Sequence, residues 1–382
     1  MFDHVALPSC SPPVALSPPL GCNPSTALGT LCTTVSTIIE KASCEELGTQ
    51  AYVQKLIEGV GLAGDMRGRR IYGTASKLMR RVGSHTGLWQ DPQQISRALL
   101  VLGSVPRRPS DALEPFRYVE VGVYTAWTCV IVSSYLKRTQ GKHGFEGLAV
   151  DVKVGNIAQG TFDLMKRLNI GFEGRGGFNK RLKEVRDNPS NNKPVRFDAC
   201  FIDGAHDYSS VKGDYAQLAP LCGATMFHDI QDSSTMIDNS GGGTYSGGVP
   251  MFWAHARGHV KASRAIELTM QGAPYWPVFG IGVILPGPTW TAEPDDGRGT
   301  VSMWPKWKGD GAPALYRALC TDEAPAASPE HLPPQYVARS VLCPIANATN
   351  LESLLAATKR SVPKPLLEYA MGLPWNKTRA RR

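Results

Sequence analysis

Residues 197–208 read FDACFIDGAHDY, and this stretch contains a strand, a turn and several polar groups in close succession. The apolar strand stops at Asp203, Gly204 turns the chain, and His206 follows three residues after the acid. In an open α/β sheet, ligands bind beyond the carboxyl ends of the strands. The stretch therefore predicts both a sheet and the edge at which its functional groups lie.

Short apolar runs alternate with helical segments between residues 116 and 286, which predicts a parallel sheet with helices on both faces. Between the fourth and fifth runs, Val211, Tyr215 and Leu218 share one helical face, as a crossover helix requires. The expected fold class is α/β, with a Rossmann-like sheet of seven strands. The predicted strands are residues 117–121, 147–151, 169–172, 197–203, 224–229, 265–269 and 280–285.

The remaining sequence divides by composition and spacing. Residues 1–45 are predicted to be a disordered extension, because the first 30 are rich in Pro, Ser and Gly. Residues 46–110 are predicted to form a helical preface, since Tyr52, Leu56 and Val60 recur at four-residue spacing. The sheet domain is expected over residues 111–287, and residues 288–382 receive no assignment.

The composition is that of a folded protein: 42% hydrophobic and 19% charged residues exclude a chain disordered throughout, a collagen and a charged coiled coil. No apolar run approaches the roughly 18 residues of a membrane span, so no membrane partner is expected. A net charge of +8 permits an anionic partner. The basic clusters at residues 67–81 and 377–382 are better explained as solvated helix faces and a basic tail, so a nucleic-acid partner stays open but is not favoured.

Nine cysteines are scattered along the chain and never spaced as C-x-x-C. This pattern argues against a disulfide framework or a zinc site and favours a reducing compartment. The chain starts without the basic and apolar segments of a secretory signal. A cytoplasmic protein is therefore expected.

Acidic residues follow the first two predicted strands. Glu120 and Gly122 lie in YVEVG, where the glycine lets backbone approach a ligand. Asp151 ends the second strand, and an acid there can accept both hydrogen bonds of a ribose diol. Together these residues predict a nucleotide-type cofactor site. The alternative is an ordinary strand-to-helix turn with a surface Glu and a helix-capping Asp.

The fourth and fifth strands end in two further acids and two histidines. Carboxylate oxygens suit hard divalent cations and imidazole is also a competent ligand, so Asp203, His228 and Asp229 could hold one metal ion. A neutral His206 beside them could act as a general base. The alternative is a pair of histidines with purely structural partners.

The order of these motifs resembles that of the class I S-adenosylmethionine-dependent methyltransferases. It consists of E-x-G after the first strand, Asp after the second, F-I-D-G-x-H-x-Y after the fourth, F-H-D after the fifth, and G-V-P-x-F-W at residues 248–253. Within that class it is most similar to the group of macrolide-sugar and rhamnosyl O-methyltransferases. The resemblance covers residues 90–287 and is strongest over residues 197–253.

The resemblance implies a mostly parallel sheet with a reversed last hairpin, and S-adenosylmethionine as the cofactor. Glu120 and Gly122 would border its methionine portion and Asp151 would take its ribose hydroxyls. The expected cofactor-binding residues are Glu120, Gly122, Thr125, Asp151 and Asp203.

The resemblance also implies catalytic roles. Metal-dependent relatives carry their ligands at the positions of Asp203, His228 and Asp229, where a divalent ion such as Mg²⁺ is expected, and the closest sugar-modifying relatives have their presumed base at the position of His206. Three features depart from the family. Ala126 and Trp127 stand where many members have small residues, His228 replaces an acid, and Arg175 is atypical for the segment that would face adenine.

The expected function is methyl transfer from S-adenosylmethionine to an oxygen of a small hydroxylated acceptor, with divalent-metal assistance. Two alternatives stay open: a catalytically inactive binding or scaffold protein with a methyltransferase fold, and a nucleic-acid methyltransferase. The Gly- and Ser-rich residues 231–248 would be a lid over the acceptor or a disordered surface loop.

Overall fold

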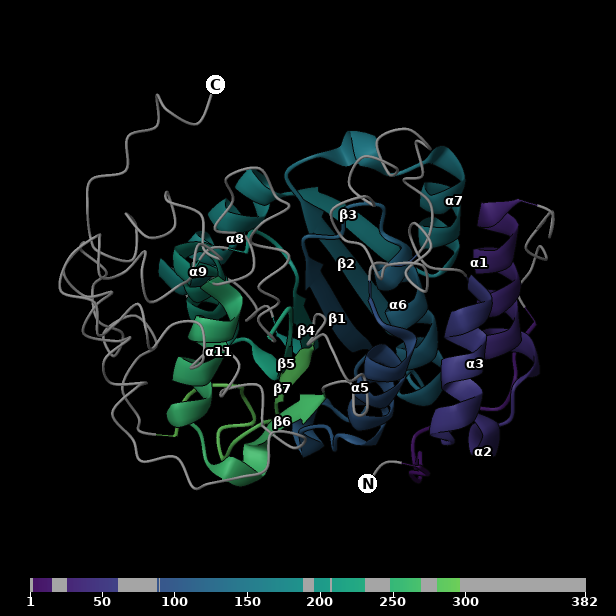
Figure 1. Ribbon diagram of the computed structural model, residues 1–382, viewed down its shortest axis with the longest axis horizontal. Coiled ribbons are helices and arrows are strands. Elements are labelled where there is room, and N and C mark those ends of the chain that lie inside the picture. Colours follow the sequence, from purple (N-terminus) through teal and green to yellow (C-terminus); the bar gives the residue numbers. More distant parts are fainter. Residues whose placement is uncertain are drawn as a thin grey trace, which may run out of the picture.

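The computed structural model describes residues 3–15, 26–60, 88, 90–187, 196–206, 208–230, 248–268 and 280–295. Seven strands form one sheet in the order β3-β2-β1-β4-β5-β7-β6 (Figure 1). The pairs among β1 to β5 are parallel, whereas β7 runs antiparallel to β5 and to β6. The strands are β1 (Phe116–Val121), β2 (Phe145–Asp151), β3 (Ile170–Gly174), β4 (Phe197–Ile202), β5 (Cys222–His228), β6 (Ala265–Leu268) and β7 (Ile281–Ile284).

These strands confirm the expected α/β class, and each predicted strand end lies within two residues of the observed one. The reversed last hairpin, which the resemblance implied, is present as the β6 and β7 pair. Strand order reverses between β1 and β4, because β2 and β3 lie to one side of β1 and the later strands to the other. A crevice opens at such a reversal beyond the carboxyl ends of the strands, so the site is expected past Val121.

Helices cover both faces of the sheet (Figure 1). Helices α5, α6 and α7 lie on one face with α1 and α3 packed outside them, and α8, α9 and α11 lie on the other. The helices are α1 (Ala27–Ser36), α2 (Cys44–Leu47), α3 (Gln50–Val60), α5 (Pro92–Ser104), α6 (Trp127–Thr139), α7 (Gln159–Arg167), α8 (Arg175–Asp187), α9 (Tyr208–Leu218) and α11 (Gly248–Gly258).

Helix α5 connects the N-terminal region to the sheet. The Asp91 carboxylate accepts the backbone N–H groups of Gln93 and Gln94, and Pro92 occupies the first helical position, so two ordinary start signals fix where the helix begins. The backbone N–H of Gly280 donates to Gln94 Oε1 (3.0 Å) immediately before β7. The helix is therefore held against the sheet in a defined register.

Residues 26–45 differ from the predicted disordered extension. They include helix α1, whose N-terminus is capped by the Thr26 hydroxyl, and the following π-helical turn η1 (Thr37–Lys41). Leu31, Val35 and Ile38 are buried in the same apolar cluster as side chains of α5 and α6. The prediction was wrong there because it was based on the Pro, Ser and Gly content of the region. It overlooked that the apolar residues of α1 share one helical face, which is long enough to be buried. The remaining domain boundaries stay predictions.

Two cysteine pairs correct the prediction of unpaired cysteines. Cys10 is disulfide-bonded to Cys44, with their Cα atoms 5.9 Å apart, and Cys200 in β4 is bonded to Cys222 in β5, at 6.0 Å. Pairing depends on distances that the fold sets and not on spacing along the chain, so the C-x-x-C criterion could not detect it. The cysteine spacing therefore no longer supports a reducing compartment, and the cytoplasmic location stays a prediction.

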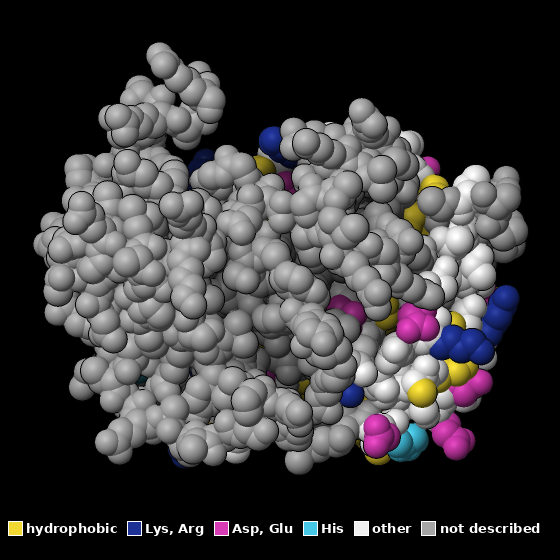
Figure 2. All heavy atoms as spheres, in the orientation of Figure 1, with side chains coloured by type: hydrophobic (Ala, Val, Ile, Leu, Met, Phe, Trp, Pro, Cys, Tyr) yellow, Lys and Arg dark blue, Asp and Glu magenta, His cyan; other side chains and the backbone are white. Residues whose placement is uncertain are grey.

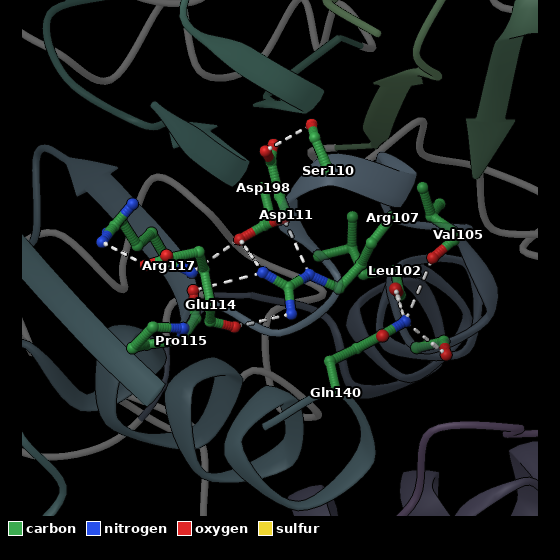
Figure 3. A network of polar contacts seen from close by, with 11 residues as sticks. Leu102, Val105, Arg107, Ser110, Asp111, Glu114, Pro115, Arg117, Gln140 and Asp198 are labelled. Atoms are coloured by element: carbon green, nitrogen blue, oxygen red, sulfur yellow. Dashed lines mark hydrogen bonds and ion pairs between the residues drawn. The ribbon is translucent and has the colours of Figure 1, made fainter. Parts of the chain in front are cut away.

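At the amino ends of the strands, Arg107 makes a partly buried ion pair with Asp198 (Figure 3). Its Nε lies 3.0 Å from Asp198 Oδ1, and its two Nη atoms donate to the backbone carbonyls of Glu114 and Pro115. Asp198 Oδ2 also accepts the backbone N–H of Arg117 (2.8 Å). These contacts join the loop before β1 to β4, so we assign the pair a structural role, although it borders a cavity of about 790 Å³.

Among the described residues, no helix is both long and apolar enough to cross a membrane. On the face in Figure 2, acidic and basic side chains are interspersed where the described surface is visible, near α1 to α3. The described part of the chain does not include the basic clusters at residues 67–81 and 377–382, or residues 296–382 as a whole. It also excludes all but the last residue of the expected lid at residues 231–248.

Candidate functional site

A cavity of about 820 Å³ lies at the carboxyl ends of β1, β2, β4 and β5. Every residue that the sequence singled out for cofactor, metal or catalytic roles lines it, although these residues come from four separate segments of the chain. They are Glu120, Gly122, Thr125, Asp151, Asp203, His206, His228 and Asp229. The structure thus brings the predicted residues together, while their individual roles stay predictions.

Gly122 is required where β1 leaves the sheet. Its φ of +89° lies in the left-handed region, and a Cβ atom there would overlap the carbonyl group of Asp203. Two backbone hydrogen bonds hold the chain after β1 close to the ends of β4 and β2. They run from Asp203 N to Val121 O (2.8 Å) and from Gly122 N to Val150 O (2.8 Å). The ends of β1, β2 and β4 therefore meet at the floor of the cavity.

Asp151 organises the loop that follows β1. Its Oδ2 accepts the backbone N–H of Tyr124 (2.8 Å), and its Oδ1 accepts that of Lys153 (2.9 Å). Tyr124 and Ala126 both have positive φ values, of 48° and 63°, so this loop is strained and needs such anchors. Each carboxylate oxygen has a second lone pair, so Asp151 could still accept hydrogen bonds from a ribose.

Glu120 is almost completely buried, at 1% exposure, and its Oε2 accepts a hydrogen bond from the Tyr118 hydroxyl (2.6 Å). Burial raises the pKa of Glu120 to about 8, although the Tyr118 hydroxyl opposes this shift. The carboxyl is therefore mostly neutral at pH 7 in the ligand-free protein. A cationic cofactor placed beside it would favour its ionisation.

Two aspartate–histidine pairs stand side by side in the cavity. His206 Nδ1 lies 2.8 Å from Asp229 Oδ2, and His228 Nδ1 lies 3.0 Å from Asp203 Oδ1 and 3.4 Å from Asp229 Oδ1. The His228 ring therefore lies between both carboxylates. Asp229 and His228 are buried, whereas the His206 side chain is 25% exposed and so is open to a ligand.

The two pairs shift the pKa values of their members. Burial alone would lower the pKa of His228, but the charges of Asp203 and Asp229 outweigh it and raise that pKa to about 9. Burial likewise opposes the upward shift of the His206 pKa, which follows from the hydrogen bond to Asp229. Burial would raise the pKa of Asp229, but His228 and His206 lower it instead. Asp229 thus remains an anion that can orient and stabilise a protonated imidazole.

The ligand atoms that converge best on a cation differ in one residue from the predicted set. Asp203, His206 and Asp229 each offer one ligand atom, and these three atoms lie within 4.8 Å of one another. Two carboxylates and an imidazole suit a divalent ion. His228 Nδ1, which the sequence placed in this set, instead contacts the two carboxylates.

Sequence reasoning did not identify Gln90. It is 2% exposed, precedes the Asp91 cap of α5, and its Nε2 donates to Asp203 Oδ2 (2.7 Å). Its Oε1 accepts a hydrogen bond from the Thr128 hydroxyl on α6. The only sequence signal nearby was the helix start at Asp91 and Pro92, which says where α5 begins but not what the preceding side chain touches.

Arg175, the atypical residue of the segment expected to face adenine, lies at the N-terminus of α8 and forms an ion pair with Asp214 on α9. Both residues line the cavity. Of the segment expected to face adenine, residues 173–177, the first two end β3 and the remaining three begin α8.

No protein-family model matches this chain, and no curated protein matches it. Among solved structures, an O-methyltransferase from Bacillus cereus in complex with SAH is 13% identical, with 56% of this chain and 98% of that chain covered and a TM-score of 0.33. The O-methyltransferase TomG from Streptomyces achromogenes, in complex with SAM, is 11% identical, with 57% and 90% covered and a TM-score of 0.35. The DszA carbon methyltransferase is 14% identical, with 68% and 66% covered and a TM-score of 0.38.

Proposed function

We propose that this chain is an S-adenosylmethionine-dependent methyltransferase that methylates a hydroxyl oxygen of a small acceptor, with His206 as the general base. The proposal depends on one observation. The His206–Asp229 pair, joined at 2.8 Å, lines the same cavity as Glu120, Gly122 and Asp151. A proton acceptor and the residues expected to bind the cofactor are therefore within reach of one bound pair of substrates.

Asp229 fixes the tautomer of His206. Its Oδ2 lies 2.8 Å from His206 Nδ1, so the carboxylate would favour a proton on that nitrogen, and the lone pair of the neutral ring would then reside on Nε2, where it could take the proton of an acceptor hydroxyl. When that proton arrives, the buried anion of Asp229 stabilises the imidazolium. Such a base contributes roughly 10²- to 10⁴-fold to a rate.

The remaining residues would bind and orient the cofactor. S-adenosylmethionine supplies an electrophilic methyl group, which is transferred by in-line displacement, so the protein must chiefly align it with the oxygen. Asp151 would accept the ribose hydroxyls, and Gly122 allows close approach of the backbone. Glu120 supplies a buried carboxyl that can ionise beside the positive charges of the cofactor.

Divalent-metal assistance is the second part of the proposal. Asp203 and Asp229 are the carboxylates that would hold the ion, and a bound ion would lower the pKa of the acceptor hydroxyl. If His206 supplies the third ligand, its lone pair is no longer available to accept a proton. The two roles of His206 therefore exclude each other, and an experiment can separate them.

The test uses S-adenosylmethionine with a labelled methyl group, a panel of small hydroxylated acceptors, and assays with either Mg²⁺ or EDTA. We expect cofactor binding by calorimetry and methyl transfer that His206→Ala lowers at least about 100-fold. His143→Ala, at an exposed position, serves as the control. Activity retained in EDTA would assign His206 as the base without a metal, whereas cofactor binding without transfer to any acceptor would favour a scaffold protein.

A further inference from the structure

The buried side chain of Gln90 connects the helical preface to the polar groups of the cavity. Asp203 can only accept hydrogen bonds when ionised, so the amide NH₂ of Gln90 must face it. The carbonyl end must then accept from the Thr128 hydroxyl. Both ends of the amide are thus determined, and Gln90 can occupy this place in only one orientation.

Asp203 is held from both sides. Gln90 Nε2 lies 2.7 Å from its Oδ2, and His228 Nδ1 lies 3.0 Å from its Oδ1. Two donors on opposite oxygens fix the plane of the carboxylate as well as its position. Among the described residues, Gln90 is the only residue before β1 that lines this cavity.

The sheet order indicates what this carboxylate faces. In the order β2-β1-β4-β5, Asp151 ends β2 and Asp229 follows β5, so Asp203, directly after β4, lies between them. If the ribose is bound at Asp151 and the acceptor at His206 and Asp229, the methyl group is transferred in the space between these groups. When no divalent ion is bound to it, an oriented carboxylate there would attract the positive sulfur that carries the methyl group.

We propose that Gln90 is a positioning residue that aims the Asp203 carboxylate at the sulfonium end of S-adenosylmethionine, an inference that rests on the proposed function. It follows that the N-terminal preface completes the cofactor site. Gln90 touches neither the reacting atoms nor the acceptor and acts through Asp203.

The test compares two ligands that differ by one methyl group and one positive charge, S-adenosylmethionine and S-adenosylhomocysteine, by calorimetry on the full chain. Gln90→Met keeps the length of the side chain but removes both hydrogen bonds. We expect it to weaken S-adenosylmethionine binding on the order of tenfold, and S-adenosylhomocysteine binding by less than about threefold. Thr128→Val should change the ratio of the two dissociation constants in the same direction, by a smaller factor.

Gln140→Met is the matched control, since Gln140 is also a buried glutamine near helix α5, but near the end of that helix. Its Nε2 donates to the backbone carbonyls of Leu102, Gly103 and Val105 (Figure 3). A purely structural loss should change the affinity for both ligands equally, so Gln140→Met should leave their ratio unchanged. Adding Gln90→Met to Asp203→Asn should cause little further loss, because both variants remove the same oriented charge.

The outcomes are separable. Wild-type protein that binds neither ligand would overturn the proposed function and this inference with it. Wild-type binding together with an unchanged affinity ratio in Gln90→Met and Thr128→Val would overturn the role of Gln90 while the proposed function stands. Using two variants keeps the test decisive if Gln90→Met does not fold.

Discussion

Replacing Glu120 with Gln should make the ligand-free protein more stable at neutral and alkaline pH. Glu120 is fully buried, and its pKa rises from an ordinary value of 4.5 to about 8. Between these two pH values the folded protein retains a proton that the unfolded chain has released. The free energy of unfolding must therefore fall as the pH rises, by about 1.4 kcal/mol per pH unit.

Glutamine has nearly the same shape, cannot ionise, and can still accept the hydrogen bond from Tyr118. The free energy of unfolding of the variant therefore does not fall with pH in this way. It should exceed that of the wild type by nearly zero below pH 4.5 and by about 3 kcal/mol at pH 7. The gain is complete at about pH 8, where the wild-type carboxyl ionises in the folded state as well. His228 titrates in both proteins, so most of its contribution cancels in the difference.

Urea denaturation at half-unit pH steps from 4.5 to 8.5 measures this difference directly. Tyr118→Phe provides an internal check. In the wild type the Tyr118 hydroxyl lowers the pKa of Glu120, so without it this pKa should rise further. The free energy of unfolding of the variant should therefore keep falling up to a higher pH. A difference between Glu120→Gln and wild type that stays constant from pH 5 to pH 8 would show that the carboxyl is already ionised in the folded protein, and the reasoning would fail.

Three further predictions concern the loop after β1, the cofactor and the N-terminal region. Gly122→Ala places a methyl group against the Asp203 carbonyl at a positive φ, and the backbone conformation alone should cost about 1–3 kcal/mol in urea unfolding, whereas Gly155→Ala, in open space, should cost less than about 1 kcal/mol. Asp151→Ala removes the acceptor of two backbone N–H groups and should weaken S-adenosylmethionine binding at least about tenfold by calorimetry; unchanged affinity would reject its ribose role. Cys44→Ser breaks the disulfide across a separation of 34 residues and should lower the free energy of unfolding by about 3–4 kcal/mol under oxidising conditions, while under reducing conditions variant and wild type should coincide.

The sheet could be predicted from sequence because buried strands are short, apolar and bounded by polar residues, as in residues 197–203. The order of the strands could not be read from this pattern, since pairing joins residues far apart in the chain, and the resemblance implied only the reversed last hairpin. Helix α1 was missed although Leu31, Val35 and Ile38 have helical spacing, because the composition around them suggested disorder. The disulfides depend on distances that only the fold sets.

The candidate site was predictable where a residue lies at the carboxyl end of a strand or directly after it. Glu120, Asp151, Asp203, His228 and Asp229 all satisfy this condition, and they line one cavity. Which partner each one contacts was not predictable. A change of a few ångströms decides whether the ring nitrogen of His206 or that of His228 converges with the two carboxylates on a point where a metal ion could bind, and the spacing of residues along a strand does not specify side-chain direction at that scale.

The N-terminal region shows most clearly what linear reasoning leaves out. By sequence it is a preface that ends near residue 110, yet buried side chains of α1, α3, α5 and α6 form one apolar cluster with residues of β1. Buried Arg138 of α6 donates to the Ala42 carbonyl and contacts both sulfurs of the Cys10–Cys44 disulfide, so the residues around this disulfide are packed against the helix that follows β1. Gln94 is bonded to the start of β7 and Gln90 to Asp203, so α5 reaches both the reversed hairpin and the cavity. Because α5 packs against α3 and begins next to Gln90, which is bonded to Asp203 in the cavity, a loss of packing in the N-terminal helices should alter cofactor affinity before it unfolds the sheet.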